Sequence, residues 1–564
     1  MKKKPFLKIG FICLFIFQTL YVLNACKKKP FDDLKVNIDT DVFVSPMIIE
    51  FENANSKSTT PLPDFTITIE GKDASKILSS IGTKTYSVYD GWISLNLAQG
   101  TSPSASNPIQ FTLKVKATNG FEALNKEISI DNTDELKLKI RLIEKNALPE
   151  GVKEKINVIT TTNGELTAPL IVTTEKSIDK EQSVELKIET GTQFKNKDGI
   201  TITKPLTSTI RFFDVSDESI SIFPGGLTPQ KVKDKDGKDI EGGVTFFTAG
   251  LVQVNMKSAD GNEVKNFSKP VSAEIRLNPD QDNFKTGVPV KENDSIPLWS
   301  YDETTMVWSE NAKQAYVVKN EDGTLSAKFD MNHLSCWNLD WGWSMFGGLG
   351  TSKSKLDVVF NTDWANASGN YEITMRSPNG GYLAALHGAS IFNGYVATFT
   401  STPEIPLVYL EIRDNATGKI TKKTEKFNPS TTGKITINIK DEIVDMVNIS
   451  LKYDIKCTSS PKISPNSSTW IVITDIETGK KIKLYTGITN NKKTKGALNL
   501  RLQDKKNYKI STTGSDGKII SCEALLDKNN LISKNIKGLQ ITKLIYNASS
   551  NTVEIECIYT TSKC

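Results

Sequence analysis

Apolar and polar residues alternate along most of the chain. Side chains of a β-strand point alternately to its two faces, so such segments are expected to be strands with one buried face. Stretches with the period of an amphipathic helix are missing. The pattern predicts an all-β chain of tandem, Ig-like β-sandwich domains. The clearest segments are Phe65–Ile69, Phe111–Val115, Leu136–Ile140, Val184–Ile188, Ile435–Ile439 and Val553–Ile555.

Tight-turn dipeptides separate many of these segments. Asp-Gly and Asn-Gly accept the positive φ angles of two-residue hairpin loops, so they predict β-hairpins. They occur at Asp90-Gly91, Asn119-Gly120, Asp198-Gly199, Asp260-Gly261, Asp322-Gly323, Asn379-Gly380 and Asp516-Gly517.

Composition shifts divide the chain into four predicted domains. A linker at 146–151 and a glycine-rich hinge at 346–354 set two of the boundaries. We expect a β-sandwich at 36–145, a larger β-rich domain at 150–345, an Ig-like β-sandwich at 355–441 and a C-terminal β-sandwich at 445–564.

The first 26 residues predict where the protein goes. A basic start is followed by an apolar stretch that ends in Leu23-Asn24-Ala25-Cys26. This resembles a bacterial lipoprotein signal, which implies a signal peptide at 1–25, a Cys26 that carries lipid such as palmitate, and a lipidated tether at 26–35. An ordinary secretory signal or membrane anchor is the alternative. Polar residues interrupt the apolar stretch, which argues against a membrane-spanning helix.

The charge balance excludes one class of partner. Without the four lysines of the signal, 66 basic residues face 65 acidic ones. A nucleic-acid-binding domain normally carries a strong basic excess, so no nucleic acid is expected as a partner. The membrane is expected as a partner through the lipid on Cys26.

The larger β-rich domain carries a spaced series of motifs. They include Phe223-Pro-Gly-Gly226, Phe247-Thr-Ala-Gly250, Asn293–Asp302 and His333-Leu-Ser-Cys-Trp-Asn338. In this order they resemble a β-rich region of bacterial surface lipoproteins and of animal matrix proteins such as cartilage intermediate layer protein. The resemblance covers residues 180–345 and implies flanking Ig-like or carboxypeptidase-regulatory-like sandwiches.

Acids follow lysines directly after the tether begins. Asp32-Asp33 comes after Lys27–Lys29, with Pro30 and Phe31 between them. This resembles the export signal of Bacteroidota lipoproteins. It implies a lipid-anchored protein of the bacterial outer membrane that is displayed on the cell surface.

Conventional catalysis has few residues to use. The chain holds two histidines, His333 and His387, and a nucleophilic triad would require one of them. No pair of carboxylates and no zinc-ligand pattern stands out. We therefore expect no enzyme activity, no cofactor and no metal, and we expect a structural role for His387.

His333-Leu334-Ser335 is the sharpest chemical candidate. It resembles the self-cleavage site of GAIN domains in adhesion receptors, where a histidine acts as base for a hydroxyl two residues on. The resemblance implies cleavage between Leu334 and Ser335. Packing is the alternative, because His333 and Ser335 share one face of a strand with nearby tryptophans.

Tryptophans and cysteines leave further alternatives. Five tryptophans form either an exposed platform for stacking on sugars or part of a core. Cys457 and Cys557 both continue inward-facing alternation, so they form either a disulfide across a sandwich or two buried thiols. The tryptophans are Trp299, Trp308, Trp337, Trp341 and Trp343.

The sequence thus favours a lipid-anchored, non-catalytic cell-envelope protein that acts in binding or adhesion toward a protein or glycan ligand. Two alternatives remain: an autoproteolytic surface module and a glycan-binding component of a nutrient-uptake system.

Overall fold

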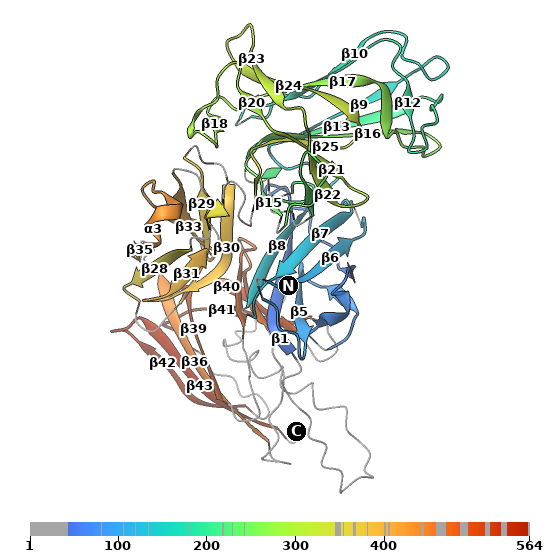
Figure 1. The fold of residues 1–564 in the computed structure, drawn as a ribbon. Helices are drawn as coiled ribbons and strands as arrows, with labels where there is room; N and C mark the ends of the chain where they lie inside the picture. Colours follow the sequence, from blue (N-terminus) through green and yellow to red (C-terminus); the bar gives the residue numbers. More distant parts are fainter. Residues whose placement is uncertain are drawn as a thin grey trace, which may run out of the picture.

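Strands carry almost all of the regular structure in this chain (Figure 1). The computed structural model describes residues 43–561, with gaps at 345–350, 441–444, 458–469, 486–494, 514–518 and 532–538 and shorter gaps of one to three residues. Helix in these ranges is limited to short pieces such as η2 (Ala74–Lys76) and α3 (Pro429–Thr432). The all-β prediction is confirmed. None of the described helices is long and apolar enough to cross a membrane.

The first sandwich follows the predicted alternation. Phe111, Leu113 and Val115 of one predicted segment are all buried in its core. Its two sheets have the orders β3-β5-β1-β8 and β4-β2-β6-β7. The strands are β1 (Phe43–Asn53), β2 (Phe65–Glu70), β3 (Ile77–Ser79), β4 (Tyr86–Val88), β5 (Trp92–Ala98), β6 (Ile109–Val115), β7 (Leu124–Ile130) and β8 (Leu136–Leu142).

The third and fourth sandwiches follow one another along the chain. The third consists of β27 (Thr351–Ser352), β28 (Leu356–Thr362), β29 (Gly369–Arg376), β30 (Tyr382–Ile391), β31 (Val396–Phe399), β32 (Thr402–Pro403), β33 (Tyr409–Asp414), β34 (Ile420–Lys423) and β35 (Lys434–Ile439). The fourth consists of β36 (Met446–Cys457), β37 (Trp470–Asp475), β38 (Lys481–Tyr485), β39 (Lys495–Gln503), β40 (Asn507–Thr513), β41 (Ile519–Leu525), β42 (Leu539–Asn547) and β43 (Thr552–Thr561).

These three smaller sandwiches repeat one topology. In each of them the first long strand pairs in parallel with the last strand: β1 with β8, β28 with β35, and β36 with β43. One sheet reads β5-β1-β8, β31-β28-β35 and β39-β36-β43 in turn, and the other reads β4-β2-β6-β7, β30-β29-β33-β34 and β38-β37-β40-β41. The chain therefore contains three copies of one sandwich plan, although their sequences differ.

The large sandwich lies between the first and third sandwiches in sequence and has another plan. Its main sheets have the orders β10-β11-β17-β24-β23-β20 and β14-β22-β21-β25-β16-β13-β9. Its strands are β9 (Val152–Ile159), β10 (Leu170–Thr173), β11 (Val184–Ile188), β12 (Phe194–Lys195), β13 (Leu206–Phe213), β14 (Val232–Lys233), β15 (Val244–Thr245), β16 (Thr248–Ser258), β17 (Asn266–Arg276), β18 (Asp282–Asn283), β19 (Val288–Pro289), β20 (Ser295–Ile296), β21 (Leu298–Asp302), β22 (Val307–Glu310), β23 (Ala315–Lys319), β24 (Leu325–His333), β25 (Cys336–Asp340) and β26 (Trp343–Ser344).

The predicted turns differ in how closely they match a two-residue hairpin loop. Asp90 and Gly91 both adopt positive φ, 52° and 73°, as such a loop requires. At Asp198-Gly199, Asp260-Gly261 and Asp322-Gly323 the glycine has positive φ and the aspartate does not. Gly120 and Gly380 also have positive φ, and Gly517 lies outside the described residues. These dipeptides therefore located turns without specifying their type.

The sandwiches pack against one another. Figure 1 shows the large sandwich at one end and the three copies gathered at the other. Ile48 and Trp92 of the first sandwich form one apolar cluster with Trp470 and Val472 of the fourth. Arg211 of the large sandwich pairs with Glu122 of the first, with a closest distance of 2.8 Å. Contacts between sandwiches are therefore apolar in some places and ionic in others.

Candidate functional site

The predicted cleavage segment lies where the chain crosses between sheets. His333 ends β24 in one sheet of the large sandwich, and Cys336 begins β25 in the other. Leu334 and Ser335 form the link between them. The amide of Leu334 donates to the carbonyl of Lys265 at 3.0 Å, which fixes the link against the neighbouring strand.

The two predicted catalytic side chains have separate partners. Ser335 Oγ donates to the carbonyl oxygen of Tyr301 at 2.5 Å. The His333 ring packs against the Trp337 ring, with centroids 4.9 Å apart. Burial lowers the pKa of His333, with Asp302 acting in the opposite direction. Among the described residues, no hydrogen bond joins His333 to Ser335, and cleavage at this bond stays a prediction.

The end of the same motif has a structural task that the sequence did not reveal. Asn338 and Asp340 are fully buried. Asp340 accepts from the Phe247 amide at 2.8 Å and from Asn338 Nδ2 at 3.1 Å. Asn338 accepts from Thr248 Oγ1 at 2.7 Å, and Thr248 accepts from the Gly250 amide.

This buried network holds an irregularity in β16. The register between β16 and β25 shifts between Thr248 and Gly250. Such a bulge leaves backbone groups without ladder partners. Asp340 accepts from the Phe247 amide and Thr248 Oγ1 from the Gly250 amide, and Asn338 links these two side chains. Burial raises the pKa of the Asp340 carboxyl well above its usual value. These residues of β25 therefore stabilise the irregular backbone of β16.

The tryptophans belong to the core. Trp299, Trp308, Trp337 and Trp341 are all buried, so an exposed sugar-stacking platform built from them is wrong. The side chain of Trp343 lies outside the described residues. Aromatic residues here pack edge to face, as Phe246 does with Trp299 and Trp308. Alternation alone did not distinguish a buried ring from an exposed one.

The Pro-Gly-Gly motif also serves packing. Gly225 has a φ of 73°, and a Cβ on it would lie 2.4 Å from Trp308 Nε1. Only glycine fits both the backbone conformation and the space under this indole ring. The motif therefore closes the core around Trp308 and provides no exposed group for chemistry.

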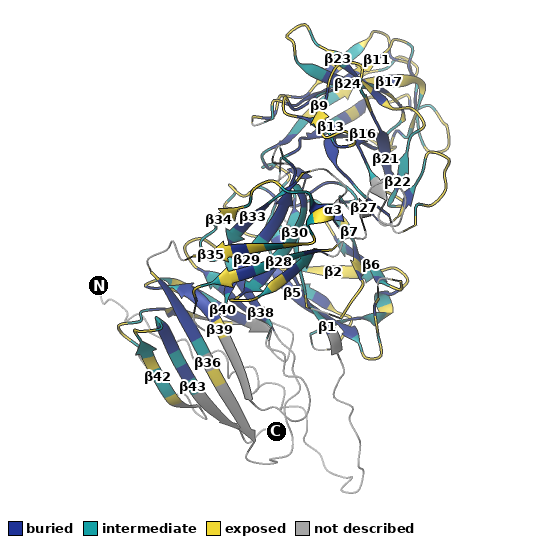
Figure 2. Cartoon of the chain, turned by 60° about the vertical axis from the view of Figure 1, so that its left-hand side comes forward, coloured by how far each residue is buried: buried dark blue, intermediate teal, exposed yellow. Residues whose placement is uncertain are grey.

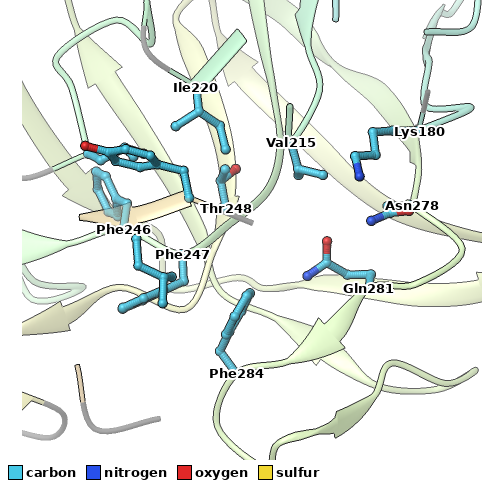
Figure 3. Close-up of a pocket in the computed structure, with 12 residues that line it drawn as sticks. Lys180, Val215, Ile220, Phe246, Phe247, Thr248, Asn278, Gln281 and Phe284 are labelled. Carbon is cyan, nitrogen blue, oxygen red and sulfur yellow. The ribbon is translucent and has the colours of Figure 1, made fainter. Parts of the chain in front are cut away.

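One cavity opens between the large and third sandwiches (Figure 3). Its polar end is formed by Lys180, Asn278 and Gln281, and phenylalanine rings line the rest. The cavity volume that water centres can occupy is about 20 Å³. This is enough for one or two water molecules and too small for a sugar. The lining residues are Lys180, Val215, Ile220, Leu227, Phe246, Phe247, Thr248, Asn278, Gln281, Phe284, Tyr382 and Leu383.

A second buried polar region joins the three smaller sandwiches. We call it the central junction and define it by Glu50, Lys137 and Lys139 of the first sandwich, Glu372 and His387 of the third, and Lys481 and Lys483 of the fourth. Glu50 contacts Lys483 directly and lies 3.6 Å from Lys481. Glu372 lies 3.3 Å from His387 Nδ1 and 3.8 Å from Lys139.

Charge pairing outweighs burial at this junction. Burial alone raises the pKa of Glu50, but Lys483, Lys481 and Lys139 outweigh it and lower that pKa to about 2. Burial also raises the pKa of Glu372, and His387, Lys139 and Arg141 hold it well below its usual range. Both carboxylates therefore stay charged at neutral pH. His387, expected to be structural, takes part in this junction.

Lys137 is the exception. Its Nζ donates to the Gly388 carbonyl at 2.7 Å and lies 5.7 Å from the Trp470 ring centroid. Burial lowers its pKa to about 8, with Glu135 acting in the opposite direction. The third and fourth sandwiches thus cover the Lys137 ammonium. Its close contacts among the described residues are a carbonyl and an aromatic ring and include no carboxylate.

Cys457 and Cys557 lie too far apart along their strands to form a disulfide. In the parallel pair of β36 and β43, Cys457 lies opposite Thr561 and Cys557 opposite Tyr453. Four residues of strand separate the two positions, about 13 Å, whereas a disulfide needs Cα atoms within about 7 Å. The predicted link across a sandwich is wrong in this register. Their side chains are outside the described set, as are Cys26 and Cys564.

Cys336 is a buried free thiol. Burial raises its pKa well above the usual value, and Glu303, whose Oε1 lies 3.3 Å from Sγ, adds to this effect. A protonated thiol is a poor nucleophile, so Cys336 is suited to packing. In the part of the chain that the structure describes, no three metal-ligating side chains come together.

Comparison with known proteins gives little. No family model and no curated protein matches the chain. Among solved structures, the shaft pilin SpaA from Lactobacillus rhamnosus GG is 8% identical, with a TM-score of 0.15, covering 37% of this chain and 98% of that one. The Bacillus anthracis TIE protein is 10% identical, with a TM-score of 0.14, covering 67% of this chain and 73% of that one. TM-scores this low show no shared overall fold, so the all-β class rests on the strands themselves.

Proposed function

We propose that the protein is a lipid-anchored, non-catalytic binding or adhesion protein of the bacterial outer-membrane surface. In this proposal Cys26 carries the lipid, the three repeated sandwiches form the support, and the large sandwich makes the contact. A protein is the favoured partner, because Trp299, Trp308, Trp337 and Trp341 are buried and offer no platform for stacking on sugars.

The position of the large sandwich at one end of the molecule, with exposed apolar side chains on it, carries the proposal (Figure 1). Of the fourteen large apolar side chains that are exposed in the described residues, seven belong to the large sandwich and none to the first. Exposed aliphatic and aromatic groups cost solvation free energy that a protein contact recovers. The seven are Ile156, Val158, Ile171, Ile178, Ile200, Val288 and Tyr316.

The direction of β1 supports the same arrangement. β1 begins at Phe43, soon after the predicted tether. It ends at Asn53, next to Ala54, which packs into a core cluster of the large sandwich. A strand of eleven residues spans about 35 Å. The large sandwich therefore lies at the opposite end of β1 from Phe43, the end that leads back in sequence to the predicted tether.

Contact through the large sandwich is tested on cells that display the full chain. Retention on immobilised fibronectin, collagen and mucin is compared for the native chain and an Ile178→Ser/Tyr316→Ser variant. The matched control is Phe392→Ser/Leu407→Ser, which removes exposed apolar groups of the third sandwich. We expect the first variant to lose at least about five-fold in retention on one of these surfaces, while the control keeps it. Equal retention of all three chains, or none above empty cells, would contradict the proposal.

The anchor is tested separately. Cells grown with an alkyne analogue of palmitate should label the native chain and not the Cys26→Ser variant. Protease added to intact cells should digest the labelled chain if it is displayed outward. Label in the Cys26→Ser variant, or protection from protease, would contradict the predicted anchor or its outward display.

A non-catalytic protein should also remain one chain. The intact mass of the purified mature chain is compared with that of a Ser335→Ala control. We expect a single mass in both, because the Ser335 hydroxyl donates to Tyr301. Two fragments that meet between Leu334 and Ser335, and that disappear in the control, would establish the autoproteolytic alternative instead.

A further inference from the structure

The large sandwich has one long unpaired strand edge. Its two main sheets have five edge strands, of which β12, β14 and β20 contain two residues and β10 contains four. β9 contains eight residues, and all eight pair with β13 on one side. No described strand pairs with the other side of β9. Short edges resist strand addition, and a long edge offers a row of free backbone donors and acceptors.

The same strand exposes apolar side chains on its outer face. Ile156 is 59% exposed and Val158 is 70% exposed, more than any other large apolar side chain on a described strand. They lie beside Thr209 and Thr207 of β13 in the register. An extended edge strand with an apolar outer face has the two features that β-strand addition uses.

We propose that β9 pairs antiparallel with β9 of a second copy of this chain, across a two-fold axis. The pairing would join two seven-stranded sheets into one continuous sheet. It goes beyond the proposed function, because it depends neither on the lipid nor on a ligand.

The charges of β9 favour a second copy. Residues that pair across a two-fold axis in an antiparallel ladder share one face of the sheet. An axis at Ile156 sets Ile156 against its own counterpart and Lys155 against Asn157. An axis at Asn157 sets Ile156 against Val158 and Lys155 against Ile159. In both cases the exposed apolar groups of the two copies meet, and no like charges lie opposite.

The lysines restrict where such pairing can occur. Lys153 and Lys155 share a face with Phe212 and Ile210 of β13, which belong to the core side of the sheet. An axis at Lys155 sets this ammonium against its counterpart, and an axis at Glu154 sets Lys153 against Lys155. Inward charges of this kind discourage indiscriminate addition at an edge. The strand therefore selects its register.

Sedimentation equilibrium of the full mature chain tests the proposal. The chain carries Cys26→Ser to prevent acylation and is measured from about 1 to about 100 μM, a range suited to interfaces of modest affinity. We expect a concentration-dependent mass of twice the monomer. An Ile156→Lys/Val158→Lys variant should dissociate at least about ten-fold more readily, because four lysines would then face one another.

The matched control is Ile171→Lys, an equally exposed position on β10. It should dimerise like the native chain, and circular dichroism and thermal unfolding should show that all three chains are folded. A native chain that stays monomeric to about 100 μM overturns the proposal, as does a dimer that the β9 substitutions leave unchanged. The proposal is also overturned if the chain is a monomer and its β9 amides gain protection from hydrogen exchange only when a peptide of unrelated sequence is added.

Discussion

Two equivalent sheet faces have different surroundings in this molecule. One is formed by β1 and β8 of the first sandwich, and the other by β28 and β35 of the third. Each is the outer face of the sheet that holds the parallel first and last strands. In the first sandwich the third and fourth sandwiches cover it, and Lys137 and Lys139 are half-buried. In the third sandwich Thr436 and Asn438 are exposed (Figure 2). The same sheet face therefore contacts other sandwiches in the first sandwich and is exposed to solvent in the third.

The difference teaches what alternation encodes. Leu136–Ile140 and Ile435–Ile439 alternate in the same way, and both are strands with an apolar inner face. Alternation specifies which side chains point away from the core of a sandwich. It does not specify whether water or another sandwich covers them, since that depends on residues far along the chain. Lys137, for instance, donates to Gly388.

The largest predicted effect comes from the apolar part of the covered face. Trp470→Ala removes a fully buried ring from the cluster that it forms with Ile48 and Trp92. We expect a loss of about 3–5 kcal/mol in the free energy of unfolding, from lost burial and the cavity left behind. Val396→Ala on β31 of the third sandwich should change it by less than about 0.5 kcal/mol. Urea unfolding measures both, and equal losses would abolish the contrast between the faces.

Glu50→Gln is next in size. It removes the carboxylate from a contact with Lys483, whose side chain is 8% exposed, and leaves a buried ammonium without its partner. The expected loss is about 3 kcal/mol in the free energy of unfolding. Asp357→Asn on β28, which keeps an acceptor for Thr398, should cost under about 1 kcal/mol.

A double variant sharpens the same prediction. Adding Lys483→Met to Glu50→Gln removes the unpaired charge, so part of the lost stability should return. If the double variant is no more stable than Glu50→Gln alone, packing of the Glu50 side chain and not its charge holds this part of the junction.

Acid should weaken the covered face first. The pKa of Glu50 is about 2 in the folded protein, below its unfolded value, so its contribution is present above about pH 4.5 and disappears as the pH falls toward 2. Between pH 5 and 2.5, amide protection factors, which are corrected for the pH dependence of intrinsic exchange, should fall in β1 and β8 before they fall in β28 and β35. A simultaneous fall in both sandwiches would count against the assignment.

The sequence predicted the strands and turns better than it predicted the site. Phe111–Val115 and Asp90-Gly91 depend on neighbours in sequence, and both formed as expected. The motif residues were found as well, but their tasks depend on distant partners. Ser335 donates to Tyr301, and Asp340 holds Phe247. No spacing rule relates residues that meet only after the sheets have stacked.

Lys137→Met has the smallest expected effect and separates burial from pairing. Among the described residues, the close partners of the covered Lys137 ammonium are a carbonyl and an aromatic ring, and burial lowers its pKa to about 8. A methionine removes the cost of burying the ammonium as well as its hydrogen bond, so the free energy of unfolding should change by less than about 1 kcal/mol near pH 7. The native chain should gain stability as the pH rises from 8 toward 10, because the unfolded lysine still binds a proton there and the folded one does not. The variant should lack this gain. Lys137→Met could instead cost as much stability as Glu50→Gln. In that case an unpaired buried charge stabilises the covered face as much as a paired one, and carboxylate pairing does not explain the stability of this face.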